Sequence, residues 1–307
     1  SDLVDIKEHP YGADANEFVL ADLTDPQEVA KVIALKGNDF FDEIYQLAAD
    51  MGGAGYIFTG ENDANVMHNS ATINLNILHA LTIRNSLISQ NKTKVFYSSS
   101  ACVYPEDKQL EPDHPGLRES DAYPARPDSE YGWEKLFSER LFFAFSRNHG
   151  IPVRVARFHN IFGPEGTWTG GREKVPAAMC RKVAELGSEG TIDIWGDGEQ
   201  TRSFLYIDDC LQAVEKFMNQ DFPGPLNIGS EKSISINALA LLIASFEGKR
   251  IYINHIDGPL GVRGRNSNND LLRKYLNLDL SLNFESGLRT TYTWIKSQIK
   301  KESEFVP

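Results

Sequence analysis

The chain has 307 residues, of which 41% are hydrophobic and 24% charged, and its formal net charge is −12. These proportions exclude a collagenous or disordered chain and leave enough apolar material for a sizeable core. The acidic balance argues against nucleic acid as a partner, because binding a phosphate backbone needs basic excess.

The three cysteines, Cys102, Cys180 and Cys210, are an odd count without metal-ligand spacing. Neither a disulfide framework nor a metal site is predicted from them. No apolar run is long enough to span a bilayer, and the first residues carry no basic-then-apolar signal segment. We therefore expect a cytoplasmic protein without a membrane partner.

Along the first half of the chain, short apolar strands alternate with helical segments. The pattern predicts strands at 18–23, 42–49, 94–99 and 153–158. It also predicts one helix that begins near Asp25 and two long helices at about 65–84 and 129–148. A glycine-rich loop, 51–55, follows the second of these strands. This alternation is typical of a Rossmann-type α/β fold, a doubly wound parallel sheet with right-handed crossovers.

After about residue 163 the glycines multiply and the alternation ends. Residues 192–204 predict a β-hairpin with an Asp-Gly turn, and helices are expected at about 208–219, 235–246 and 285–300. We interpret 164–307 as mainly a smaller α/β lobe that binds substrate at the C-terminal edge of the sheet. Residues 1–163, with return segments, form the sheet domain.

A glycine-rich dinucleotide fingerprint is absent. A dinucleotide-binding unit opens with a strand and a G-x-G-x-x-G turn, with an acidic residue about 20 positions later. Ser1-Asp2 resembles the end of a second strand, so the first strand, first helix and phosphate loop are expected upstream of residue 1. Asp2 is then placed to accept hydrogen bonds from the adenosine ribose. We therefore interpret 1–163 as an NAD-binding domain.

Tyr131 and Lys135 are the first candidate catalytic pair. At positions i and i+4 of a helix their side chains project from one face. A neighbouring ammonium stabilises a phenolate, so we expect Lys135 to lower the pKa of Tyr131 and make it a base for a hydroxyl proton. The alternative is a half-buried ring beside a solvated charge.

A serine-rich segment that follows the strand at 94–99 strengthens this interpretation. Ser100 stands where a doubly wound sheet presents groups to its ligand, at the C-terminal end of a strand. Cys102, two residues on, has a thiol that can move protons on carbon acids. The alternative for Cys102 is a small buried hydrophobe, a common role of free cysteine.

The strand at 153–158 leads into a second candidate segment. Asn160 is placed to hydrogen-bond a nucleotide phosphate or a sugar. Lys174, at the end of the glycine-rich loop that follows, is either a second acid/base or an exposed loop lysine. We interpret His159 as structural.

The second lobe offers cations and amides suited to a diphosphate, because arginine forks match phosphate oxygens. The alternative for the pair at Gly261-Val-Arg-Gly-Arg265 is solvated charge. The candidates are Lys182, Gln200, Arg202, Arg263 and Arg265.

Six stretches of the chain carry a family resemblance. They are Leu47-Ala-Ala-Asp-Met-Gly-Gly, Ser99-Ser-Ala-Cys-Val-Tyr-Pro-Glu, Arg157-Phe-His-Asn-Ile-Phe-Gly-Pro, Gly170-Gly-Arg-Glu-Lys-Val-Pro-Ala-Ala, Trp195-Gly-Asp-Gly-Glu-Gln-Thr-Arg-Ser-Phe and Gly261-Val-Arg-Gly-Arg-Asn-Ser. Through them the chain resembles the GDP-mannose 3,5-epimerases, a family of NAD-dependent extended short-chain dehydrogenases/reductases. The resemblance extends along essentially the whole chain.

The resemblance implies a reaction and its residues. GDP-mannose would be converted to GDP-L-galactose and GDP-L-gulose through a transient 4-ketone. Tyr131, with Lys135 and Ser100, would take the proton of the carbon-4 hydroxyl while NAD accepts the hydride. Cys102 and Lys174 would remove and return the protons of carbons 3 and 5.

The resemblance also implies binding residues and an assembly. For the substrate these are Gly53 beside the hexose and Asn160, Lys182, Gln200 and Arg265 at the GDP; for NAD they are Asp2, Asp22, Leu23 and Ala48. A homodimer would form through the helices at 65–84 and 129–148.

Other functions stay open. The chain could be a 3,5- or 4-epimerase or a 4,6-dehydratase acting on another nucleotide sugar, such as a GDP-heptose. Cys102 and Lys174 argue against the 4-epimerase and the dehydratase. A non-catalytic nucleotide-sugar binder is the alternative from a different class, because a fold alone does not prove activity.

Overall fold

The computed structural model describes residues 18–33, 41–87, 92–113, 115–258, 261–280 and 283–305. Its helices are α1 (Pro26–Ile33), α2 (Ala54–Ile57), α3 (Asp63–Ser86), α4 (Glu130–His149), α5 (Val175–Glu185), α6 (Ile207–Met218), α7 (Ile236–Ser245), α8 (Asp270–Leu276) and α9 (Phe284–Phe305). Short 3-10 turns are η2 (Ala101–Val103), η3 (Glu106–Lys108) and η4 (Glu119–Ala122).

The strands form one larger sheet and several small ones. They are β1 (Glu43–Gln46), β2 (Lys94–Ser100), β3 (Val153–Phe158), β4 (Ile161–Phe162), β5 (Glu189–Trp195), β6 (Thr201–Ser203), β7 (Leu205–Tyr206), β8 (Leu226–Ile228), β9 (Ser233–Ser235), β10 (Arg250–Ile256) and β11 (Gly264–Arg265). The larger sheet has the order β1-β2-β3-β8, and every pair in it is parallel. The predicted parallel α/β architecture is confirmed.

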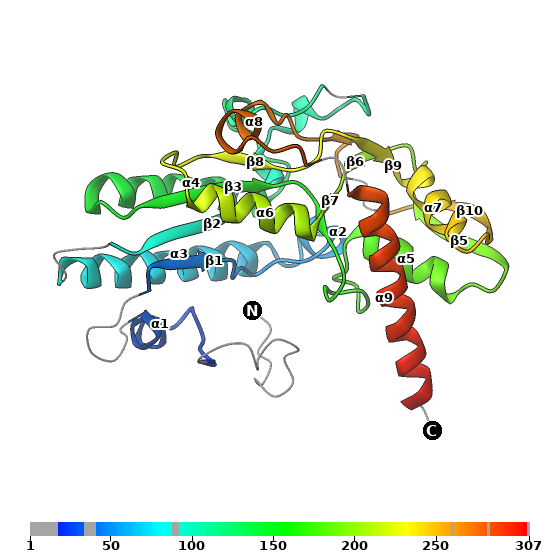
Figure 1. Ribbon diagram of the computed structural model, residues 1–307, viewed down its shortest axis with the longest axis horizontal. Helices are drawn as coiled ribbons and strands as arrows, with labels where there is room; N and C mark the ends of the chain where they lie inside the picture. Colours follow the sequence, from blue (N-terminus) through cyan, green and yellow to red (C-terminus); the bar gives the residue numbers. More distant parts are fainter. Residues whose placement is uncertain are drawn as a thin grey trace.

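Helices cover both faces of this sheet because its strands are apolar on both sides (Figure 1). Along β2, Val95 and Tyr97 pack with residues of α3 and α4, whereas Phe96 packs with residues of α6 and α8. Successive side chains of a strand point to opposite faces, so one strand supplies both cores.

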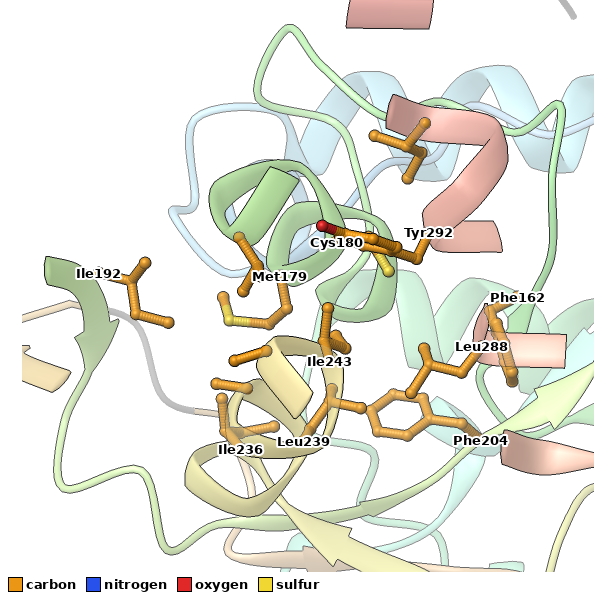
Figure 2. Packing of buried hydrophobic residues seen from close by; sticks show 14 of the residues in the cluster. Phe162, Met179, Cys180, Ile192, Phe204, Ile236, Leu239, Ile243, Leu288 and Tyr292 are labelled. Atoms are coloured by element: carbon orange, nitrogen blue, oxygen red, sulfur yellow. The ribbon is translucent and has the colours of Figure 1, made fainter. Parts of the chain in front are cut away.

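The later part of the chain builds a second core beside the carboxyl end of the sheet. Helices α5, α7 and α9 surround it, and Figure 2 shows Met179, Leu239 and Leu288 reaching into it. Figure 1 shows α9 running away from the sheet toward the C-terminus. Among the described residues, no helix is both long and apolar enough to cross a membrane. The division into 1–163 and 164–307 stays a prediction.

Two local predictions are wrong. Residues 18–23 form no strand and pair with no described strand, and Phe18, Val19 and Leu20 are exposed. Residues 192–204 form no hairpin, although Gly196 and Gly198 do turn the chain with positive φ. Strand β5 pairs in parallel with β10, whereas β6 pairs with β9 and β11 in another sheet. The long-range partners β9, β10 and β11 override the local turn signal.

Most of the predicted helices are confirmed with shifted ends. The helix expected at 129–148 is α4, which begins after Ser129, whose hydroxyl accepts from the Gly132 amide. It ends at Gly150, which has φ 63°, a conformation that favours glycine. Helices α2, α5 and α8 have no counterpart among these predictions.

A buried ion pair holds α4 to the sheet. Arg157 on β3 donates from Nε and Nη2 to the two carboxylate oxygens of Glu139 on α4, at 2.8 and 2.7 Å. The side chains are 1% and 3% exposed. Removing one partner of such a pair leaves the other charge buried and uncompensated.

We predict that Glu139→Gln lowers the free energy of unfolding by about 3–5 kcal/mol, because Arg157 keeps its charge and loses its counter-ion. Urea denaturation measures it. Glu185→Gln is the matched control, since Glu185 forms an exposed i,i+4 pair with Arg181 and such pairs contribute only about 0.5 kcal/mol. Equal effects of the two changes would contradict the prediction.

Candidate active site

A cavity of about 480 Å³ lies beyond the carboxyl ends of β2 and β3, between the larger sheet and the second core. Side chains from both parts of the chain line it, as the sequence predicted for a ligand in a doubly wound fold. The predicted site residues that border this cavity are Gly53, Ser100, Cys102, Tyr131, Lys135, Asn160, Lys174, Lys182, Gln200, Arg202 and Arg265.

The turn after β2 presents Ser100 and Cys102 to the cavity. The Ser100 hydroxyl accepts from the Cys102 amide at 3.2 Å, which caps the turn η2 and fixes the thiol two residues on. Cys102 is only 7% exposed. It is therefore both buried, as the structural alternative holds, and part of the cavity wall, as the catalytic interpretation requires.

Helix α4 brings Tyr131 and Lys135 against this turn. A Cβ on Gly132 would lie 2.2 Å from the Cys102 carbonyl oxygen, so this close approach needs a glycine. Lys135 is 3% exposed, and its ammonium donates to the Ser98 carbonyl at 2.9 Å. The same ammonium lies 5.7 Å from the centre of the Tyr131 ring.

The expected lowering of the Tyr131 pKa is wrong for the chain's own residues. Burial raises the pKa of Tyr131, and the charge of Cys102 adds to the rise. A hydrogen bond with Ser100 and the charge of Arg265 act in the opposite direction but are smaller. Burial also lowers the pKa of Lys135, which makes it a weaker source of positive charge.

Lys174 borders the cavity from a loop that ends at the first turn of α5. A Cβ on Gly53 would lie 2.7 Å from the Glu173 carbonyl oxygen, so the 51–55 loop and the Lys174 loop touch at a glycine. Arg181 of α5 holds Glu173 in an ion pair at 3.0 Å. The position of Lys174 is thus fixed from both sides.

The Lys174 side chain is exposed because it borders open cavities, yet protein atoms crowd its ammonium and burial lowers its pKa. A thiolate at Cys102 would oppose this fall. The thiol and the amine therefore share one cavity wall closely enough to interact electrostatically.

Arg265 and Arg263 have different surroundings. Arg265 is 6% exposed and donates from Nη1 to the Cys102 sulfur at 3.2 Å. Arg263 does not border the cavity; it forms an ion pair with Asp197 at 2.8 Å. Of the two predicted clamp arginines, only Arg265 reaches the site.

The remaining polar candidates line the wall toward the second core. Gln200 donates to the Trp195 carbonyl, while its buried Oε1 has no partner in the described structure. Lys182 donates to the Asp193 carbonyl at 2.6 Å. Burial, helped by the charge of Arg265, lowers the pKa of Arg202 to about 9.

Two further polar candidates differ in their freedom to bind. Asn160 has a positive φ of 47° and donates to the Ser203 carbonyl. His159 is fully buried, its Nε2 is 3.0 Å from Asn227 Oδ1, and burial lowers its pKa to about 3. The structural interpretation of His159 fits this neutral, enclosed ring.

A second cavity, of about 830 Å³, borders the first and shares Lys174 and Met51 with it. Asp22 and Leu23 line this second cavity, as expected of the cofactor side. Ala48 lines neither cavity and packs against the core under α3. Asp2 lies outside the described residues.

Sequence reasoning missed Asp128 and Gln109, which both contact Arg265. It also missed Arg172, which stacks on the Tyr56 ring at 4.4 Å and so ties the Lys174 loop to α2. The only local signal for Asp128 was its position three residues before Tyr131. Nothing near Gln109 in the sequence marks it as a partner of a residue 156 positions away.

A family model described as the NAD dependent epimerase/dehydratase family matches residues 3–229. A GDP-mannose 3,5-epimerase of Arabidopsis thaliana is 46% identical over 287 residues, covering 94% of this chain and 72% of that protein. The X-ray structure of Pal from Bacillus thuringiensis is similar with a TM-score of 0.78 and 26% identity, over 95% of this chain and 87% of that one. The fold is also that of the UDP-glucose 4-epimerase of Thermotoga maritima, with a TM-score of 0.76, 20% identity, and 92% and 85% coverage.

We predict that Gly132→Ala lowers both stability and activity. Helix propensity alone would favour alanine by about 1 kcal/mol, but the new methyl would meet the Cys102 carbonyl and push α4 away from the turn. We expect a loss of about 2 kcal/mol in unfolding free energy, as for an overpacked core. Thermal and urea denaturation measure it. Gly187→Ala, whose Cβ would meet nothing within 4 Å, is the control, and a Gly132→Ala protein as stable as this control would refute the argument.

Proposed function

The chain belongs to the NAD-dependent epimerase/dehydratase family, and from that premise we propose that it epimerises GDP-mannose at carbons 3 and 5 through a transient 4-ketone. The observation that carries the proposal is the presence of Cys102 and Lys174 in the wall of the cavity that also holds Ser100, Tyr131 and Lys135. The Arabidopsis relative with that name supports the substrate and the positions acted on.

Tyr131 takes the proton of the carbon-4 hydroxyl in this proposal. The raised pKa of the buried phenol means that it needs further positive charge to act as a base near neutral pH. Ser100 supplies a hydrogen bond to the phenol, and Lys135 supplies a nearby cation. The loss of a hydride from carbon 4 and of a proton from its hydroxyl leaves a ketone.

The ketone makes the protons on carbons 3 and 5 acidic, and Cys102 and Lys174 exchange them. One group removes a proton from the ring carbon and the other returns a proton to the opposite face, so each carbon inverts without net loss of atoms. Burial lowers the pKa of Lys174, which makes its amine easier to deprotonate and so better able to act as a base. Returning the hydride to carbon 4 completes the reaction without net oxidation.

The residues present fit NAD beside this sugar site. The second cavity joins the first at Met51 and Lys174, and its far wall holds the Asp22 carboxylate, a group suited to hydroxyl or amide donors. Asp22, Leu23, Tyr131 and Lys135 would hold the cofactor. Bound NAD would supply the hydride acceptor for carbon 4 and return the hydride.

Polar groups toward the second core would hold the GDP. Lys182, Arg202 and Arg265 provide the positive charge that an anionic diphosphate needs within an acidic protein. The unpartnered Gln200 oxygen accepts a hydrogen bond from a hydroxyl or an N–H of the ligand. Asn160 would join them at the GDP, and Gly53, which borders the same cavity, would lie beside the hexose.

We also propose a homodimer and a cytoplasmic location. Helices α3 and α4 lie together, linked by a hydrogen bond from Asn74 to Ser138. Each exposes large apolar side chains, including Leu75 on α3 and Trp133 and Phe137 one turn apart on α4. Covering these with the same helices of a second copy removes an apolar patch from water. The three free, buried cysteines suit a reducing cytoplasm.

The reaction is tested by incubating the full-length protein with GDP-mannose and NAD in D₂O. NMR should find deuterium at carbons 3 and 5. Lys174→Ala should lower the rate of incorporation by about 10²-fold or more, because a general acid–base group contributes that much. Lys232→Ala, on an exposed loop, is the control. Deuterium at carbon 5 alone, with loss of water, would instead identify a 4,6-dehydratase, and no exchange at all would favour a non-catalytic binder.

The dimer is tested with Trp133→Glu combined with Phe137→Glu. Charges on the covered face should shift the protein to a monomer in sedimentation velocity. Leu110→Glu, at an exposed apolar position away from α4, should leave the dimer intact. A wild-type protein that sediments as a monomer at all concentrations would rule the assembly out.

A further inference from the structure

The three donor positions of the Arg265 guanidinium each have a different acceptor. Nη1 donates to the Cys102 sulfur at 3.2 Å, Nε to the side-chain oxygen of Gln109 at 2.5 Å, and Nη2 to the Asp128 carboxylate at 2.5 Å. Because the guanidinium is planar and rigid, fixing two of its edges fixes the third. The contact with the thiol is therefore set by Gln109 and Asp128.

Asp128 is itself firmly placed. Its other carboxylate oxygen accepts from the Ser129 hydroxyl at 3.1 Å, and Ser129 caps the first turn of α4. The Asp128 side chain is 5% exposed and the Arg265 side chain 7%. Asp128 also borders the same cavity as Cys102. A buried carboxylate at this point is costly unless it is paired, and here it is paired with the cation that touches the thiol.

We propose that Asp128 is a positioning residue for the acid/base thiol. It holds Arg265 against Cys102 and neutralises enough of the positive charge of Arg265 for the thiol to keep its proton. This inference rests on the proposed function, in which Cys102 must both give and take protons. A thiolate locked in a full ion pair with an arginine could not return a proton to carbon.

Several cations surround Cys102, so a nearby negative charge is needed to offset them. Burial keeps several cations close to the sulfur without bulk water to screen them. The cationic groups that interact with Cys102 are Arg265, Arg202, Lys174 and Lys135, and the phenol of Tyr131 faces it too. Glu134 and Glu139 offset Lys135. Asp128 is the carboxylate that offsets both Arg265 and Arg202.

The test measures the alkylation of Cys102 by iodoacetamide as a function of pH, by peptide mass spectrometry on the full-length protein. Only the thiolate reacts, so the midpoint of the rate profile reports the balance of charge at the sulfur. In Asp128→Asn the amide oxygen still accepts from Arg265, but the negative charge is gone. We expect the midpoint to fall by about one pH unit, the size of shift that one nearby charge produces.

Two further variants test the direction of the shift in the midpoint and provide a control. Arg265→Met should move the midpoint the other way, because the thiolate loses its cation. Asp270→Asn removes the carboxylate of a surface pair with Arg273 and should leave the profile unchanged. Cys180 is buried in the second core and Cys210 in the core between the larger sheet and helices α6 and α8. Both should stay unmodified while each variant remains folded.

An Asp128→Asn midpoint equal to or above that of the wild type would overturn the inference, whatever the protein does to GDP-mannose. Whether the protein catalyses the proposed reaction is measured separately, by deuterium exchange into the sugar. If the wild type exchanges deuterium into the sugar, the pH profile of that exchange should shift with the alkylation midpoint in Asp128→Asn. If it does not exchange, the proposed function fails, and the alkylation series still decides the role of Asp128.

Discussion

The contact between the first turn of α4 and the backbone of Cys102 determines the rest of the site. At Gly132 the helix approaches the Cys102 carbonyl so closely that no side chain fits between them. This contact places Tyr131 beside the Ser100–Cys102 turn and, one helical turn later, Lys135 under Ser98. A wider gap would separate the phenol from the thiol, and the groups proposed to act at carbon 4 would no longer share a cavity with those proposed to act at carbons 3 and 5.

The buried ion pair of Arg157 and Glu139 stabilises this contact between α4 and the Cys102 backbone. Glu139 also accepts from the Ser99 hydroxyl, so one carboxylate ties α4 to both β2 and β3 where those strands end. The neighbouring polar groups are buried as well, and burial dominates the pKa shifts of Tyr131, Lys135 and Lys174. Burial thus weakens the screening of charge at these groups, so small changes of charge have large effects. The further cation that Tyr131 needs must come with the ligands.

The sequence predicted the parts of this structure that depend on local pattern. The long helices α3 and α4 follow from apolar spacing, and Ser100 and Tyr131 follow from their places at a strand end and on a helix face. What failed depends on distant partners. The Asp-Gly turn after Trp195 was real, but β5 pairs with β10 some sixty positions along the chain. Arg263 and Arg265 look equivalent in sequence, and hydrogen bonds from Arg263 and Gly264 to the Gln109 carbonyl orient their segment. Asp128 had no pattern of its own.

The two groups proposed to move protons at carbons 3 and 5 come from different parts of the chain and are held in place independently. Cys102 belongs to the turn after β2, whereas Lys174 belongs to the loop before α5 and is held by Glu173, Arg181 and the glycine contact at Gly53. The Lys174 amine borders both cavities, and burial already lowers its pKa. The thiol interacts with that loop through Lys174, whereas its contact with Arg265 is set by Gln109 and Asp128, which lie outside the loop. In the proposed reaction, a hexose in this cavity would therefore meet two groups that are placed separately, the thiol by the turn after β2 and the amine by the loop before α5.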